Sequence, residues 1–167
     1  MSELSRVVLE SFRRNGQVNG ALLGHLTPSD LGYSDQVGGM SIGQHLEHLV
    51  GFRKGWLAEV SPEYAKNLSY ITLEGDERFW KTTLDLDQLR AAFREGDCAV
   101  LDAVLDAYAS GQPFADVYTS DPAHFLQHTL VHDAHHRGQV LALLRQNGRT
   151  LEHMDEIERA TWPIWRM

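Results

Sequence analysis

The sequence predicts an all-α protein, a four-helix bundle with a long crossover connection between its second and third helices. Four long segments place apolar residues at helical spacing, and each has residue types typical of helix ends. Alternation typical of strands is limited to one short fragment, residues 116–119. A length of 167 residues is normal for one domain, so we expect a single domain over residues 1–167.

The first predicted helix covers residues 2–25. Two Asn-Gly steps, at residues 15–16 and 19–20, weaken this prediction because glycine costs about 1 kcal/mol relative to alanine inside a helix. The apolar residues expected near one face are Leu4, Val7, Val8, Phe12, Val18, Leu22 and Leu23.

The second predicted helix begins at Ser41, which forms a capping-box pair with Gln44, and it ends before Pro62. A loop over residues 27–39 precedes it. Residues 63–83 have a mixed composition, and we interpret them as a connection with room for one short helix. This segment is long enough to cross the bundle from end to end.

The third predicted helix starts near Asp85, with Gln88 three residues later, and runs to residues 110–111. In the fourth, Asp121 suits the N-cap, Pro122 suits the first helical position, and Asn147-Gly148 suits the C-terminal end. A further short helix is expected over residues 151–159. Two tryptophans of the tail, Trp162 and Trp165, are expected to pack over the bundle end or to form part of a dimer contact.

Composition excludes several classes of protein. A formal net charge of -8 disfavours nucleic acid as a partner, because such binding depends largely on cations that neutralise phosphates. The sequence has no apolar run of the roughly 20 residues needed to cross a membrane and no secretory signal, so we expect a soluble cytoplasmic protein. The single cysteine, Cys98, cannot form an internal disulfide, and we expect it to be buried.

Histidines carry the clearest functional pattern. Residues four apart lie on the same face of a helix, so a row of imidazoles is expected along the fourth helix, at His124, His128, His132 and His136. Neighbouring faces of that helix are apolar, which places the row beside the core. Two further histidines, His45 and His48, lie on the second helix.

A divalent metal would explain imidazoles beside the core, since polar groups buried without partners are costly. Two imidazoles at i and i+4 can bind one ion, and a third from a facing helix leaves coordination positions open, as in catalytic sites. Zn, Ni, Fe and Mn are all plausible for such ligands. Periodicity alone does not decide between this metal site and a structural polar network. The segment His45-Leu-Glu-His48 is one residue too short for a zinc-protease helix.

Two segments resemble the DinB-like superfamily of metal-binding four-helix bundles. One is the run from His132 to Gln139, HDAHHRGQ, followed by an apolar stretch and Gly148; the other is SIGQHLEH, residues 41–48. The resemblance implies that His48, His132 and His136 are the three metal ligands. His45 lies one turn from His48, so it could compete for the metal or line the pocket.

Other side chains near these ligands are candidates for lining the pocket or for hydrogen bonding to the ligand imidazoles. His128 lies on the ligand row, whereas His135 is rotated by about 100° from its neighbours and is expected to point away. For Arg137 an interhelical salt bridge is the simpler expectation. The remaining candidates are Glu47, Asp133 and Gln139.

The resemblance favours a thiol-dependent S-transferase, in which a metal-bound small thiol such as bacillithiol or mycothiol attacks an electrophilic small molecule. A hydrolase that uses metal-bound water is the alternative within the same site. A third possibility is a non-catalytic metal-binding protein, acting in a stress response or as a scaffold. The family tendency to dimerise implies a homodimer.

Overall fold

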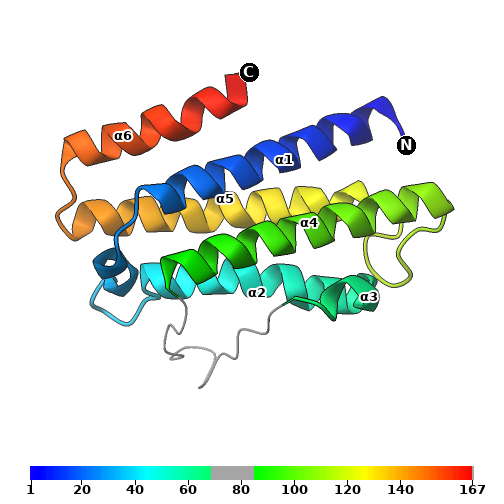
Figure 1. Cartoon of the computed structure of the whole chain (residues 1–167), viewed down its shortest axis with the longest axis horizontal. Coiled ribbons are helices and arrows are strands. Elements are labelled where there is room, and N and C mark those ends of the chain that lie inside the picture. Colours follow the sequence, from blue (N-terminus) through cyan, green and yellow to red (C-terminus); the bar gives the residue numbers. More distant parts are fainter. Residues whose placement is uncertain (69–84, 167) are drawn as a thin grey trace.

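The structure, a computed structural model, describes residues 1–68 and 85–166. It is all-α, as predicted, and the described residues contain no strand; residues 116–119 form bends and a turn (Figure 1). The elements are α1 (Glu3–Gly24), η1 (Pro28–Gly32), α2 (Ile42–Val60), α3 (Pro62–Ala65), α4 (Leu86–Ser110), α5 (Ala123–Gln146), α6 (Leu151–Thr161) and η2 (Trp162–Arg166).

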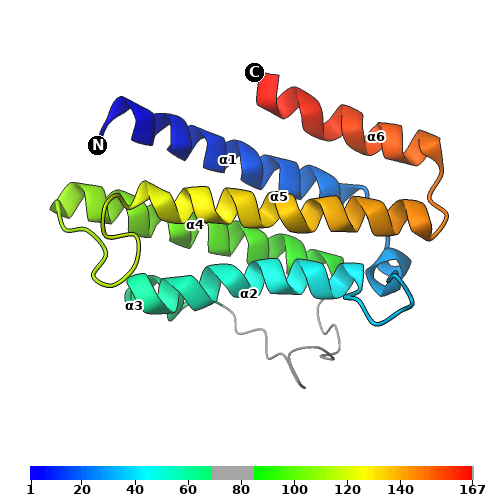
Figure 2. The ribbon, with the colours of Figure 1, turned by 180° about the vertical axis from the view of Figure 1, so that it is seen from behind.

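The four longest helices lie side by side in the closed order α1, α5, α2, α4, and α4 and α5 also make a smaller contact across the bundle (Figures 1 and 2). Helices α2 and α5 run in opposite directions, whereas α2 and α4 run in the same direction. Helix α6 packs on α1, away from α2. The connection predicted over residues 63–83 includes the short helix α3, but residues 69–84 lie outside the described part of the chain.

The helix ends follow the sequence closely. Reciprocal capping boxes form at Ser41 with Gln44 and at Asp85 with Gln88, as predicted. Gly111 ends α4 at a φ of 66°, in the left-handed region that favours glycine.

One predicted boundary is off by a residue. Helix α5 begins at Ala123 with Pro122 at the N-cap position, whereas we expected Asp121 as the cap. Asp121 still accepts the Ala123 N–H at 2.9 Å, and it also accepts hydrogen bonds from the hydroxyl groups of Ser5 and Tyr108. Its carboxylate therefore ties α5 to α1 and α4 instead of serving only as a cap.

The predicted apolar face of α1 is partly wrong. Leu4 and Val7 are 71% and 57% exposed, and Ser5 takes the inward position in the first turn. The inward stripe continues through apolar residues and then through Asn15 and Asn19, both buried. Leu4 lies about 100° from Ser5 around the helix, which removes it from the core.

The apolar core is divided into two clusters along the bundle. On α1, for example, one cluster includes Phe12 and the other begins at Leu22. Between the clusters lie buried or half-buried polar residues from all four long helices. This polar layer consists of the buried Asn15, Asn19, Arg53, Thr129 and Asp133 and the half-buried Asp97 and Arg137.

Candidate metal centre

Helices α2 and α5 face each other with two rows of ring-bearing side chains. Because the helices are antiparallel, the rings meet in sequence: His45 beside His136, His48 beside His132, and Phe52 beside His128. The sequence pattern predicted both histidine rows.

Three of these imidazoles converge. Each of His48, His132 and His136 offers one ring nitrogen, and the three nitrogens lie within 4.8 Å of one another. Nε2 of His48 lies 3.1 Å from Nε2 of His132. One ligand comes from α2 and two, four residues apart, come from α5. Among the described residues, this is the one group of three or more potential ligands that meets this criterion.

The separation of these two nitrogens suits a shared ion. Metal–nitrogen distances of 2.0–2.1 Å place two imidazole nitrogens about 3.3 Å apart in tetrahedral geometry and about 2.9 Å apart at right angles. The observed 3.1 Å between His48 and His132 lies between these values. Three neutral nitrogen ligands without thiolate leave positions open for a water or a substrate. The group could therefore hold a divalent metal ion.

Burial keeps these imidazoles in the neutral form that binds metals. Burial, followed by the charges of nearby histidines, lowers the pKa of His132 to about 4 and that of His136 to about 3. Burial also lowers the pKa of His48. At neutral pH no proton has to leave these rings before an ion binds.

His45 is buried and contacts the triad without belonging to it. Its Nδ1 lies 2.8 Å from Nδ1 of His136, so one of these nitrogens carries the proton that they share. This contact fixes the orientation of the His136 ring and leaves its Nε2 as the nitrogen for an ion. Burial, followed by the charges of His48 and His135, lowers the pKa of His45 to about 4.

His132 has one buried ring nitrogen without a partner. Within residues 1–68 and 85–166, its Nδ1 has no hydrogen-bond partner, while its Nε2 faces His48. The Phe52 ring covers this histidine in a stacked arrangement, with centroids 4.0 Å apart. If Nε2 binds an ion, Nδ1 carries the proton of the neutral ring, so the ion itself does not supply a partner for this N–H.

The other candidate residues are not part of the triad, although the rings of His128 and His135 lie next to it, with centroids 6.3 Å from His132 and 5.1 Å from His136 respectively. His128 is exposed, and its Nδ1 lies 2.7 Å from the hydroxyl of Tyr118. Gln139 contacts His135, which is exposed and lies off the ligand row, as its position on the helix predicted. Glu47 is fully buried on α2.

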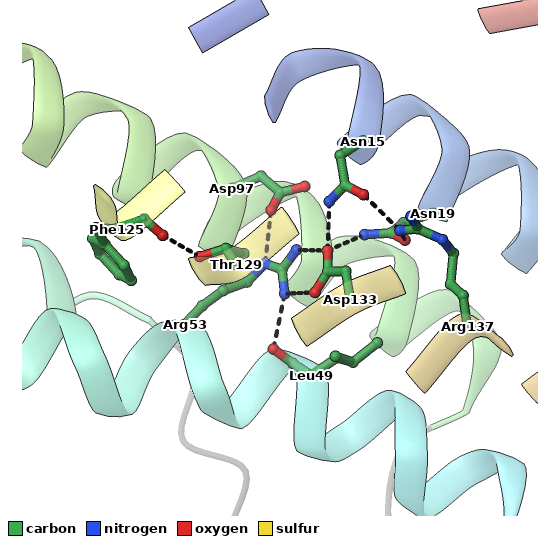
Figure 3. A network of polar contacts seen from close by, with 9 residues as sticks. All are labelled: Asn15, Asn19, Leu49, Arg53, Asp97, Phe125, Thr129, Asp133 and Arg137. Atoms are coloured by element: carbon green, nitrogen blue, oxygen red, sulfur yellow. Dashed lines mark hydrogen bonds and ion pairs between the residues drawn. The ribbon is translucent and has the colours of Figure 1, made fainter. Parts of the chain in front are cut away.

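Two other candidates, Asp133 and Arg137, belong to the polar layer (Figure 3). Asp133 accepts two hydrogen bonds from Arg53, at 3.0 and 2.7 Å, and one from each of Asn15 and Asn19. Its oxygens are thus directed to α1 and α2 and not to a ligand histidine.

The salt bridge expected for Arg137 does not form within the described residues. This side chain crosses to α1, as expected, but it donates to the amide oxygens of Asn15 and Asn19, both at 2.6 Å. Asp133, the nearest candidate carboxylate, already binds Arg53 in a bidentate pair.

Sequence analysis missed most of the polar layer. Arg53 is fully buried and also donates to Asp97 at 2.6 Å and to the Leu49 carbonyl at 2.9 Å (Figure 3). The available signal was an arginine on an otherwise apolar helix face and two asparagines, Asn15 and Asn19, four residues apart. Each residue type is unusual in a core unless it is paired.

Electrostatics hold Arg53 and Asp133 of this layer in their charged forms, whereas burial raises the pKa of Asp97. Burial alone would raise the pKa of Asp133, but the charge and hydrogen bonds of Arg53, together with Asn19 and Asn15, lower it below its usual value. Burial opposes the charge on Arg53 as well, and Asp133 and Asp97 outweigh that effect and raise its pKa.

The fold and the site define a class: an all-α protein whose two facing helices carry a candidate metal centre. The chain belongs to the DinB family, whose model matches residues 1–167, as the sequence motifs indicated. Family membership and the three-histidine cluster together suggest metal binding. Searches among curated proteins and among solved structures gave no significant match. No helix in the described residues combines the length and apolar character needed to span a membrane.

Proposed function

We propose that the chain binds one divalent metal ion through His48, His132 and His136 and uses it for thiol-dependent transfer to a small electrophile. The observation that carries this proposal is the convergence of three neutral imidazoles from α2 and α5 within 4.8 Å. Zn, Ni, Fe and Mn all remain candidates, because imidazole ligands suit each of them.

When bound, such an ion acts as a Lewis acid that lowers the pKa of a thiol or water in its open positions. The protein's own groups then have three tasks. The three imidazoles hold the ion on a helical scaffold, and His45 fixes the ring of His136. Phe52 covers His132 and limits the access of water from that side.

The thiol must come from outside the protein. Cys98 is the single cysteine of the chain, and it lies on α4, whereas the imidazoles lie on α2 and α5. The prediction that Cys98 is buried is wrong: it is exposed, because it lies well off the stripe of α4 that carries Phe93 and Val100. Similarity to the DinB-like group favours a low-molecular-weight thiol such as bacillithiol or mycothiol as the cosubstrate.

The experiment loads the protein with Co²⁺, whose visible spectrum reports its ligands, and adds a small thiol. We expect the thiol to change the spectrum, and we expect the protein to accelerate the reaction of the thiol with 1-chloro-2,4-dinitrobenzene above its uncatalysed rate only when the metal is bound. His124→Ala is the matched control, since His124 is exposed on α5 and lies outside the triad.

Each alternative gives a different result. Turnover of p-nitrophenyl acetate without thiol, and with no change of the spectrum on thiol addition, would replace transfer by hydrolysis. Metal binding with neither reaction would indicate a binding or scaffold protein. The homodimer, the cytoplasmic location and the role in a stress response stay predictions, of which sedimentation analysis tests the first.

A further inference from the structure

An open cavity of about 530 Å³ lies next to the candidate metal centre. Phe52 belongs to both, because its ring lines the cavity and stacks on His132. From there the cavity extends along α2, away from His48, toward the loop before α5. Its lining residues are Phe52, Gly55, Trp56, Glu59, Asp116 and Val117.

The aromatic wall of the cavity is held in place by further rings. Trp56 lies 6.1 Å from Phe52, 5.6 Å from His128 and 5.7 Å from Tyr118, measured between ring centroids. Tyr118 itself stacks on the buried Phe125 at 5.2 Å, and its hydroxyl contacts Nδ1 of His128. The indole of Trp56 is therefore supported from several sides and presents a rigid surface to the cavity.

Tyr118 adopts an unusual backbone conformation that places its ring. Its φ is 53°, in the left-handed region that residues with a side chain rarely occupy. Such a conformation persists where surrounding contacts compensate for it, and here these are the stack on Phe125 and the hydrogen bond to His128.

The charged side chains that line the cavity are both acidic. Glu59 and Asp116 line it with exposed carboxylates, and no Lys or Arg is among the described lining residues. Aromatic faces carry a negative potential and attract cations, most strongly at tryptophan. A rigid aromatic wall beside two carboxylates is therefore suited to an organic cation.

We propose that this cavity binds an ammonium group and that it selects substrates carrying one. The inference rests on the proposed function to the extent that the bound molecule is the electrophile that reacts at the metal. The chemical class is an alkyl- or arylammonium compound whose cationic group occupies the aromatic cavity while its electrophilic end points toward the three histidines.

The helix sets the length of such a substrate. Trp56 lies eight residues after His48, which corresponds to about 12 Å along α2 at 1.5 Å per residue. At this distance the charge of a divalent ion is largely screened at physiological ionic strength, whereas the two carboxylates border the cavity itself. The local field therefore favours a cation in spite of the metal.

The test compares choline with 3,3-dimethylbutan-1-ol, its uncharged isostere. Each compound is titrated into metal-free and metal-loaded protein, and binding is followed through the indole N–H resonance of Trp56. We expect choline to bind about fivefold or more tightly than the isostere, with and without metal, since only the cation gains from the ring faces and carboxylates.

Two pairs of variants assign the effect. Glu59→Gln with Asp116→Asn should remove most of the preference for choline, whereas Glu152→Gln with Asp155→Asn, the same charge change on α6, should leave it intact. Trp56→Leu should weaken choline binding at least fivefold, followed by calorimetry, and Trp162→Leu, an exposed tryptophan of η2, should not. Circular dichroism checks that each variant is folded.

Failure of this inference is distinguishable from failure of the proposed function. Equal binding of choline and its isostere, or equal losses in both pairs of variants, would overturn the cation site even if metal and thiol transfer are found. Conversely, choline selectivity at Trp56 in a protein that takes up no metal would support the cavity and contradict the metal enzyme.

Discussion

Two polar regions cross the interior of this bundle, and they differ in whether their groups satisfy one another. The polar layer around Arg53 is closed: Arg53 pairs with two carboxylates, and Asp133 receives hydrogen bonds from three side chains. The histidine face between α2 and α5 is open, since its rings are neutral and one ring nitrogen from each of His48, His132 and His136 converges with the others within 4.8 Å.

The glycines of the polar layer show how fully it is packed. A Cβ on Gly96 would lie 2.9 Å from Cδ of Arg53, and one on Gly16 would lie 2.8 Å from Oδ2 of Asp97. Helices α4 and α1 therefore each have a glycine where a polar side chain from a neighbouring helix passes close to the backbone. The comparison teaches that a closed polar network stabilises a particular packing, whereas an open one is available to a ligand.

The largest expected effect comes from breaking the closed layer. Arg53→Met should destabilise the protein by about 3–5 kcal/mol, because it leaves the Asp133 and Asp97 carboxylates without their cation. Urea unfolding followed by circular dichroism measures this loss. The control is Arg159→Met, which removes an exposed pair with Asp155 and should cost less than about 1 kcal/mol. Similar losses of unfolding free energy in both variants would show that the buried pairs of Arg53 stabilise the protein no more than a surface pair does.

The second-largest expected effect is stabilisation by a metal ion, which should depend on the histidine face and not on the polar layer. Saturating Zn²⁺ at 100 times its Kd should stabilise the natural protein by about 2.7 kcal/mol, and this gain should vanish in His48→Ala. His124→Ala, on the exposed side of α5, should retain the full gain. Thermal unfolding with and without metal gives the result; a gain that persists in His48→Ala would remove His48 from the ligand set.

A smaller effect is expected at His45, which contacts the proposed ligand His136 without belonging to the triad. His45→Ala should weaken metal affinity about 10- to 100-fold without abolishing binding, since the contact of His45 orients His136. Competition with a chromophoric chelator measures the affinity. Complete loss of metal would make His45 a ligand itself, and an unchanged affinity would make it part of the packing only.

The smallest effect is expected at Cys98. Cys98→Ser should change the free energy of unfolding by less than about 0.5 kcal/mol and leave thiol-dependent turnover intact, because this side chain is exposed on α4. Denaturant unfolding and the dinitrobenzene assay check both expectations. Turnover that disappears in Cys98→Ser would mean that the protein supplies its own thiol.

Local patterns predicted much of this fold. The caps at Ser41 and Asp85 and the glycine at the end of α4 depend on a few adjacent residues, and the structure has them where the sequence placed them. The facing rows of histidine were also predictable, since residues four apart share a helix face.

Contacts between distant segments were beyond the same reasoning. The Asn-Gly step at residues 15–16 suggested a weak helix, yet Asn15 binds Asp133 and Gly16 makes room for Asp97. Nothing in the local pattern shows that partners 80 or more residues away will use these positions. For the same reason Asp133, adjacent to His132 in sequence, was assigned to the metal region, although its oxygens point into the polar layer.

Metal content is the most direct test of the central claim. Elemental analysis of gently purified protein should give close to one divalent metal ion per chain, and His48→Ala, His132→Ala and His136→Ala should each lose it while remaining folded. Equal metal in the natural protein and in all three variants would contradict the claim that these imidazoles hold one ion between α2 and α5.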